Sequence, residues 1–111
     1  MQEIILVKDY ETLNIHPILI EILLDVDEVA GPGYYTSIYR PGDDGVHGTM
    51  PVRGIDRRCR HQGIGIGIAT YTNNRWVYDP SRPEMLVCKF HKIDKYGWHL
   101  HFQCHPNSVR V

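Results

Sequence analysis

The segment 84–104 constrains the fold most strongly, because apolar and polar residues alternate along two successive runs. Such alternation is typical of β-strands, whose successive side chains point to opposite faces of a sheet. The runs 84–91 and 97–104 are joined by residues 92–96, so we predict a β-hairpin.

In the second run Trp98, Leu100, Phe102 and Cys104 share one face, and His99, His101, Gln103 and His105 share the other. In the first run Leu86, Cys88 and Phe90 form the apolar set opposite Met85, Val87, Lys89 and His91. The hairpin therefore predicts a sheet with a core on one side and a polar face on the other.

The residues before the hairpin supply a helix and two more strands. Over 15–29 the apolar residues follow the i, i+3, i+4, i+7 spacing of an amphipathic helix, with Asn14 as N-cap and Gly31-Pro32-Gly33 as its end. Residues 34–40 predict a strand that ends in a loop at 41–45, and 52–59 predict a second strand with Ile55 and Asp56 on opposite faces. Together these elements indicate an α+β fold, in which the antiparallel sheet and its C-terminal hairpin pack on one or two helices. At 111 residues the chain fits a single domain, 1–111.

The segment 62–76 is ambiguous. Ile64, Ile66 and Ile68 alternate with glycines, which favours a strand, whereas the polar residues at 73–75 suggest the end of a helix. From periodicity alone we interpret this segment as a strand.

Composition limits the classes of function. The formal net charge of -1 gives no overall attraction for nucleic acid, although Arg53, Arg57, Arg58 and Arg60 form a local cluster. We find no signal peptide and no apolar stretch long enough to span a bilayer, so we expect synthesis in the cytoplasm and no membrane partner. Three cysteines without a CxxC pair indicate reduced thiols packed as small hydrophobic side chains. Seven histidines, four of them at 91–105, call for an explanation.

The histidines suggest a metal site. A His-x-His pair on one strand places two imidazoles on the same face, and neutral imidazole is a good ligand for Zn²⁺. His47 follows in a glycine-containing loop, and Asp56 lies on the next predicted strand. Two histidines, one carboxylate and a water molecule make an open tetrahedral site of the catalytic kind, although the sequence does not distinguish zinc from another divalent ion.

Four segments resemble the M15 metallopeptidases, the family of D-Ala-D-Ala carboxypeptidases and endolysin peptidases that is related to the hedgehog signalling domain. They are Thr36-Ser37-Ile38-Tyr39-Arg40, Gly45-Val46-His47-Gly48, Arg53-Gly54-Ile55-Asp56 and Gly97-Trp98-His99-Leu100-His101-Phe102, in the family's order. The resemblance implies zinc held by His47, Asp56 and His101, a catalytic role for His99 and Arg40, and substrate contacts from Ser37 and Tyr39. It also implies a helix over 62–75, which we adopt in place of the strand.

The family further implies the substrate and the setting. The expected reaction is hydrolysis of a peptide bond in the peptidoglycan stem, either D-Ala-D-Ala or L-Ala-D-Glu, by a monomer. Its shortest members resemble phage-encoded proteins, which implies release to the cell wall at lysis.

Two departures from the family pattern leave alternatives open. The spacing between His47 and Asp56, nine positions (56 − 47), is longer than in the family, and Trp98 stands where its carboxypeptidases carry a catalytic acid. We therefore assign His101 as ligand and His99 as base or transition-state stabiliser, with the reverse assignment open. The alternatives are a noncatalytic, hedgehog-like zinc domain and a nucleic-acid-processing protein that uses the arginine cluster. An acid that orients a ligand imidazole could be Asp79, Glu84 or Asp94. Three aromatic residues could either line a substrate groove or pack in the core: Tyr35, Tyr39 and Trp76.

Overall fold

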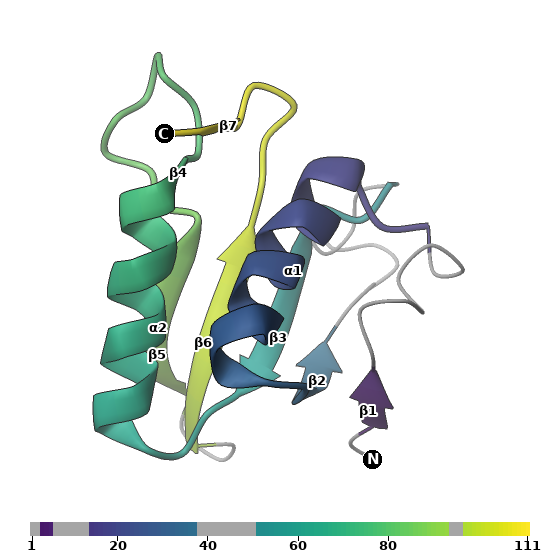
Figure 1. Ribbon diagram of the computed structural model, residues 1–111, viewed down its shortest axis with the longest axis vertical. Helices are drawn as coiled ribbons and strands as arrows, with labels where there is room; N and C mark the ends of the chain where they lie inside the picture. The colour runs from purple at the N-terminus through teal and green to yellow at the C-terminus, as the bar shows by residue number, and fades with distance from the viewer. Residues whose placement is uncertain (1–2, 6–13, 38–50, 94–96) are drawn as a thin grey trace.

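The computed structural model describes residues 3–5, 14–37, 51–93 and 97–111. Within them the order is β1 (Glu3–Ile5), α1 (Pro17–Ala30), β2 (Gly33–Ser37), β3 (Gly54–Arg58), α2 (Gln62–Arg75), β4 (Trp76–Val77), β5 (Cys88–Ile93), β6 (Gly97–Gln103) and β7 (Val109–Arg110) (Figure 1). The predicted α+β class is confirmed. Among the described residues no helix is both long and apolar enough to cross a membrane.

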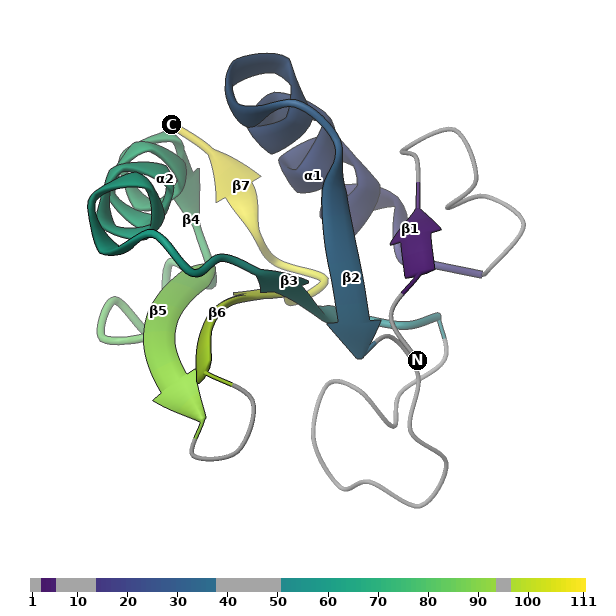
Figure 2. The ribbon, with the colours of Figure 1, turned by 90° about the horizontal axis from the view of Figure 1, so that it is seen from below.

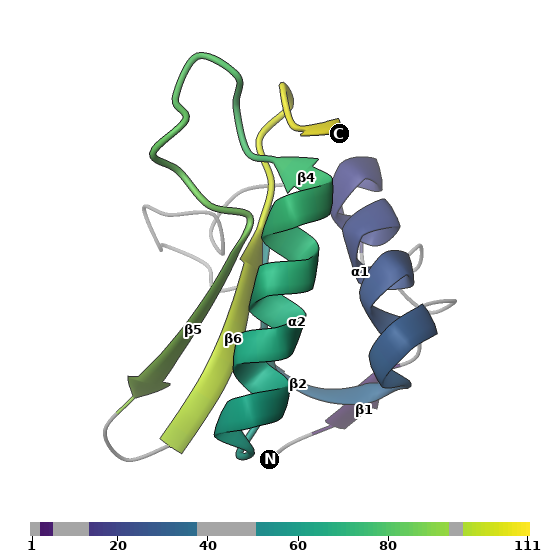
Figure 3. The same ribbon diagram turned by 60° about the vertical axis from the view of Figure 1, so that its left-hand side comes forward.

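The described strands form one large antiparallel sheet and a small ribbon. The sheet order is β1-β2-β3-β6-β5, and β4 pairs with β7 beyond the end of α2. Figures 2 and 3 show α1 and α2 side by side on the same face of the sheet. The core lies between the helices and the sheet, and the opposite face of β3 and β6 presents polar side chains.

Helix α1 follows the predicted apolar spacing but begins two residues later. Leu19, Ile22, Leu23 and Val26 are fully buried against the sheet. The helix starts at Pro17, whose fixed φ suits the first helical position, and the His16 side chain, not Asn14, caps it by accepting from the Ile18 N–H. Ile15 instead forms an isolated bridge with Val52, which draws the chain out of the helix. The predicted end is confirmed, since Gly31 adopts φ 76°.

Helix α2 confirms the interpretation drawn from the family resemblance, and the strand interpretation is wrong. In a helix the isoleucines separate: Ile68 is buried in the core, whereas Ile64 and Ile66 are more than half exposed. His61 caps the first turn by accepting the Ile64 N–H at 3.2 Å. Gly65 packs directly on the Phe90 ring of β5, where a Cβ would lie 2.3 Å from a ring carbon. Gly65 therefore reflects close packing of the helix on the sheet.

The predicted hairpin is confirmed, but its first strand is shorter than predicted and runs from Cys88 to Ile93. Cys88 pairs with Phe102 and Phe90 pairs with Leu100, so the predicted apolar faces coincide. The first strand begins at Cys88 and not at residue 84, because residues 82–85 form a turn in which the Met85 N–H bonds the Arg82 carbonyl. The alternation consequently fails there: Leu86 is exposed, and Val87 is buried.

A buried ion pair ties α1 to the sheet. Arg57 of β3 donates to Asp27 Oδ1 at 2.9 Å, to the Gly31 carbonyl at 2.8 Å and to the Tyr35 hydroxyl at 3.3 Å. Burial raises the pKa of Asp27, although the Arg57 charge and the hydrogen bonds oppose this shift. Tyr35 and Trp76 are buried, so these two aromatics belong to the core, while Tyr39 lies outside the described residues.

Candidate functional site

Asp56 and His101 meet on the face of the sheet that the helices leave uncovered. The two residues are 45 positions apart in sequence, and antiparallel pairing of β3 with β6 places them directly opposite each other. Asp56 Oδ1 lies 2.8 Å from His101 Nδ1, and the side chains are 11% and 16% exposed. Two of the three predicted metal ligands are thus in direct contact.

Gln103 holds the other side of the His101 ring. Its Oε1 lies 3.1 Å from His101 Nε2, and its own amide nitrogen donates to the Leu86 carbonyl at 2.7 Å. The sequence analysis placed Gln103 on the polar face but gave it no role. Its position two residues beyond His101 on the same strand was the signal that could have indicated one.

His99 lies on the same face of the sheet, two residues before His101 in β6, and it is only 4% exposed. Its Nδ1 is 3.0 Å from the Gly97 carbonyl, which can only accept, so Nδ1 donates. The neutral ring consequently carries its lone pair on Nε2. This tautomer suits an imidazole that takes up a proton at Nε2.

His91 adds a third imidazole to this face, and the sequence analysis gave it no role. It pairs with His99 across the hairpin, and its ring lies edge-on to that of His101 with 6.5 Å between centroids. Burial, followed by the neighbouring His101, lowers the pKa of His91. Predicting that His91 lies beside His99 and His101 would have required the exact pairing of β5 with β6, because a shift of that pairing by one residue would turn His91 to the other face.

The remaining predicted site residues are only partly placed. Ser37 lies opposite Asp56 in the pairing of β2 with β3, next to the Asp56–His101 pair. His47, Arg40 and Tyr39 lie outside the described residues. Among the residues that are described, no group of three or more His, Cys, Asp or Glu side chains could hold a metal ion. The complete ligand set therefore stays a prediction.

The donor atoms of Asp56 and His101 fit a zinc ion in kind and nearly in spacing. Carboxylate oxygen and imidazole nitrogen are both common zinc ligands, and tetrahedral bonds of about 2.0–2.2 Å separate two donors by about 3.3–3.6 Å. The observed separation is 2.8 Å, so the two atoms would have to part by only about 0.5–0.8 Å.

Trp98 occupies the other face of β6 and cannot replace the missing acid. Its ring stacks on Phe90, with 4.8 Å between centroids and 17° between planes. The position that carries a carboxylate in the carboxypeptidases is thus part of the packing between β5 and β6. Any proton acceptor near Asp56 and His101 has to come from another residue.

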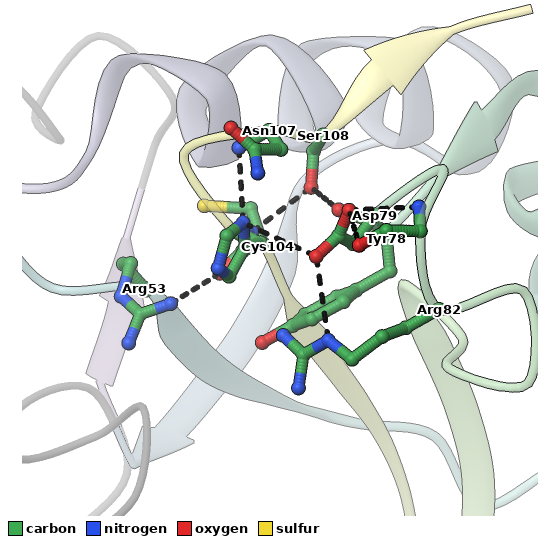
Figure 4. Close-up of polar contacts among 9 residues, drawn as sticks. Arg53, Tyr78, Asp79, Arg82, Cys104, Asn107 and Ser108 are labelled. Carbon is green, nitrogen blue, oxygen red and sulfur yellow. Dashed lines mark hydrogen bonds and ion pairs between the residues drawn. The ribbon is translucent and has the colours of Figure 1, made fainter.

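The acids considered as partners of a ligand imidazole do not reach one in the described structure. Asp79 stabilises its own turn by accepting from the Ser81 N–H and hydroxyl. It also accepts from Arg82 Nε (Figure 4). The hydrogen bonds from Ser81 lower the pKa of Asp79. Glu84 is exposed in the next turn, and Asp94 lies outside the described residues.

Ser108, His105 and Asp79 have the composition of a catalytic triad but not its geometry. The Ser108 hydroxyl donates to the Tyr78 carbonyl at 2.6 Å and accepts the His105 N–H (Figure 4). His105 Nδ1 accepts the Asn107 N–H and is 3.9 Å from Asp79. Because the hydroxyl is engaged by backbone groups and not by the imidazole, the cluster stabilises the turn before β7.

The arginine cluster is divided by the sheet. Arg57 is buried in the ion pair with Asp27, and Arg53 donates to the Cys104 carbonyl at 3.3 Å. These two guanidinium groups are engaged with partners inside the fold.

Searches against models of protein families, curated proteins and solved structures returned no match.

Proposed function

We propose that this protein is a zinc-dependent peptidase that hydrolyses a D-Ala-D-Ala or L-Ala-D-Glu bond in peptidoglycan stem peptides. The observation that supports the proposal is the contact between Asp56 and His101, which brings together two distant residues that the family resemblance assigns to one metal ion. Zinc would supply Lewis-acid polarisation of the scissile carbonyl and a nucleophile at neutral pH.

The chain's own residues have separate roles in this proposal. Asp56 and His101 hold the ion together with His47, the third ligand that the resemblance implies. His99 accepts a proton at Nε2, the nitrogen left with a lone pair by the Nδ1 contact to the Gly97 carbonyl, and returns it to the leaving amine. Following the resemblance, Arg40 stabilises the developing oxyanion.

Substrate positioning is assigned to β2 and the residues after it. Ser37 lies opposite Asp56, so the backbone of β2 runs beside the proposed metal ligands. Tyr39 is the second substrate contact that the resemblance implies.

The noncatalytic, hedgehog-like alternative is favoured by one observation, the packing of Trp98 where an acid would be needed. Zinc binding alone does not separate the two functions, because both require the metal. Hydrolysis does, so the test must measure new amino ends.

The experiment compares zinc-loaded and chelated protein on purified peptidoglycan and on synthetic stem peptides, with mass spectrometry of the products. We expect alanine or a new amino end, lost on chelation and in His99→Ala and Asp56→Ala. The control is His61→Ser, which changes an exposed histidine but keeps a residue able to cap α2.

Zinc binding without hydrolysis would support the noncatalytic domain, and failure to bind zinc would refute both the peptidase and the noncatalytic zinc domain. DNA binding that survives chelation and weakens with salt would instead support the nucleic-acid hypothesis.

A further inference from the structure

The hydrogen bonds around Gln103 determine which nitrogen of His101 carries a proton. The Leu86 carbonyl can only accept, so the group of Gln103 that lies 2.7 Å from it must be the NH₂. The amide oxygen therefore faces His101 Nε2 at 3.1 Å, and Nε2 must be the donor. In a neutral ring this leaves the lone pair on Nδ1.

That lone pair faces another acceptor. His101 Nδ1 is 2.8 Å from Asp56 Oδ1, and a carboxylate oxygen and an unprotonated ring nitrogen repel each other at this distance unless a cation lies between them. The cation is either a proton or a metal ion. With the opposite tautomer, Nδ1–H would donate to Asp56, and the pair would be satisfied with a neutral ring and no metal.

Gln103 is well placed to exclude that opposite tautomer. The residue is 5% exposed in β6, and its backbone N–H bonds the Val87 carbonyl at 2.9 Å. A 180° rotation of the Gln103 amide would place its oxygen against the Leu86 carbonyl. A move of the His101 proton from Nε2 to Nδ1 would place the lone pair of Nε2 against Gln103 Oε1. Both changes bring two acceptors together in a buried place, which is costly.

We propose that Gln103 is a positioning residue, which holds His101 in the Nε2–H tautomer so that Nδ1 is the atom that binds the metal beside Asp56. This inference rests on the proposed zinc site and adds a residue to it. Ligand histidines commonly donate their second ring N–H to an oriented acceptor, and loss of such a partner typically lowers metal affinity about 10- to 100-fold.

The first test replaces the amide and measures zinc affinity by competition with a chromophoric chelator. Gln103→Met removes donor and acceptor at similar length, and we expect zinc affinity to fall about 10- to 100-fold. Gln103→Glu keeps an acceptor for Nε2–H but loses the donor to the Leu86 carbonyl, so it should recover only part of that loss.

The matched control is Asn73→Leu. Asn73 is another amide clamped to the backbone near β5, since it donates to the Cys88 carbonyl and accepts the Cys88 N–H. This substitution also removes an amide clamp but does not touch His101, so zinc affinity should not change. Equal losses in Gln103→Met and Asn73→Leu would mean a general effect of stability and would overturn the inference.

The second test does not depend on zinc. Nitrogen-15 NMR of the His101 ring is measured in metal-free Asp56→Ala, in which no carboxylate competes for the Nδ1 proton. At a pH where the ring is neutral, we expect the proton on Nε2, and a shift toward Nδ1–H in the double variant that also carries Gln103→Met. A proton on Nδ1 in Asp56→Ala would overturn the inference. If the wild type fails to bind zinc but Asp56→Ala keeps the Nε2–H form, the proposed function fails while the role of Gln103 in setting the tautomer stands.

Discussion

Two glycines of α2, Gly65 and Gly67, should respond in opposite ways to replacement by alanine. Alanine is favoured over glycine in a helix interior by about 0.8–1.0 kcal/mol. At Gly67 nothing lies within 4 Å of the added Cβ, so Gly67→Ala should gain close to that amount. At Gly65 the Cβ would lie 2.3–2.6 Å from three carbons of Phe90, well inside the usual carbon contact of about 3.5–4.0 Å.

The Phe90 ring cannot simply move away, because Trp98 stacks against it. Overpacking of this kind costs about 1–3 kcal/mol, so after the helix-propensity gain Gly65→Ala should be neutral to about 2 kcal/mol less stable than the wild type. The two variants should therefore differ by about 1–3 kcal/mol, each kcal/mol being worth about 4 °C in Tm for a chain of this length.

Urea and thermal unfolding followed by circular dichroism measure this difference. Phe90→Leu supplies the second arm of a double-mutant cycle: in that background Gly65→Ala should lose most of its penalty, because the ring it meets is gone. Equal effects at both glycines would refute the packing of α2 on β5. They would instead favour the strand interpretation, in which both positions lie on one face.

Three further predictions concern the rest of the fold. Arg57→Met should destabilise the protein by about 3 kcal/mol in urea unfolding, because the Asp27 carboxylate and the Gly31 carbonyl lose their buried partner, and an unchanged midpoint would contradict this. Burial alone would raise the pKa of Asp25, but hydrogen bonds from Arg75 and Trp76 outweigh it and lower that pKa. The lowered value means that this carboxylate stabilises the fold above the ordinary pKa of aspartate, about 3.9, and that the stability is lost as the pH falls through the folded-state pKa. Asp25→Asn should therefore flatten the acid side of the stability profile, and an unaltered slope would contradict this. Burial raises the pKa of the Cys104 thiol to about 12, and in the native protein a thiol reagent should modify only the partly exposed Cys59, with all cysteines reacting in denaturant.

The sequence predicted those parts of the fold whose pattern depends on one element at a time. The apolar stripe of α1 and the alternation of β6 follow directly from helical and strand geometry, and both are confirmed. The start of α1 was missed, because the bridge between Ile15 and Val52 is a long-range contact that no local pattern contains. Local capping preferences favoured Asn14, and tertiary pairing overrode them.

The segment of α2 could not be assigned from periodicity, because one of its glycines is the point at which the helix touches another element. Gly65 is required by the Phe90 ring of β5, which lies 25 positions later in the sequence. The family resemblance predicted the helix where the residue pattern alone did not.

For the candidate site, the family resemblance assigned Asp56 and His101 to one metal ion, but the sequence did not predict how their side chains would be held. The pairing of β3 with β6 brings the two residues into contact, and the metal site itself stays a prediction. The roles of Gln103 and His91 depend on exact register and on hydrogen-bond direction. Neither can be read from residue type alone.

The position of β6 also has a consequence for synthesis. This strand lies between β3 and β5 in the sheet, yet in the chain it follows the four other strands of that sheet. A nascent chain that has emerged only as far as α2 has its helices and the β2–β3 pair, but nothing to pair with the free edge of β3. Because chains emerge from the N-terminal end at about 5–20 residues per second, the sheet and the Asp56–His101 contact form only after β6 is released. A ribosome-bound intermediate arrested before residue 97 should accordingly be sensitive to proteases and dependent on chaperones.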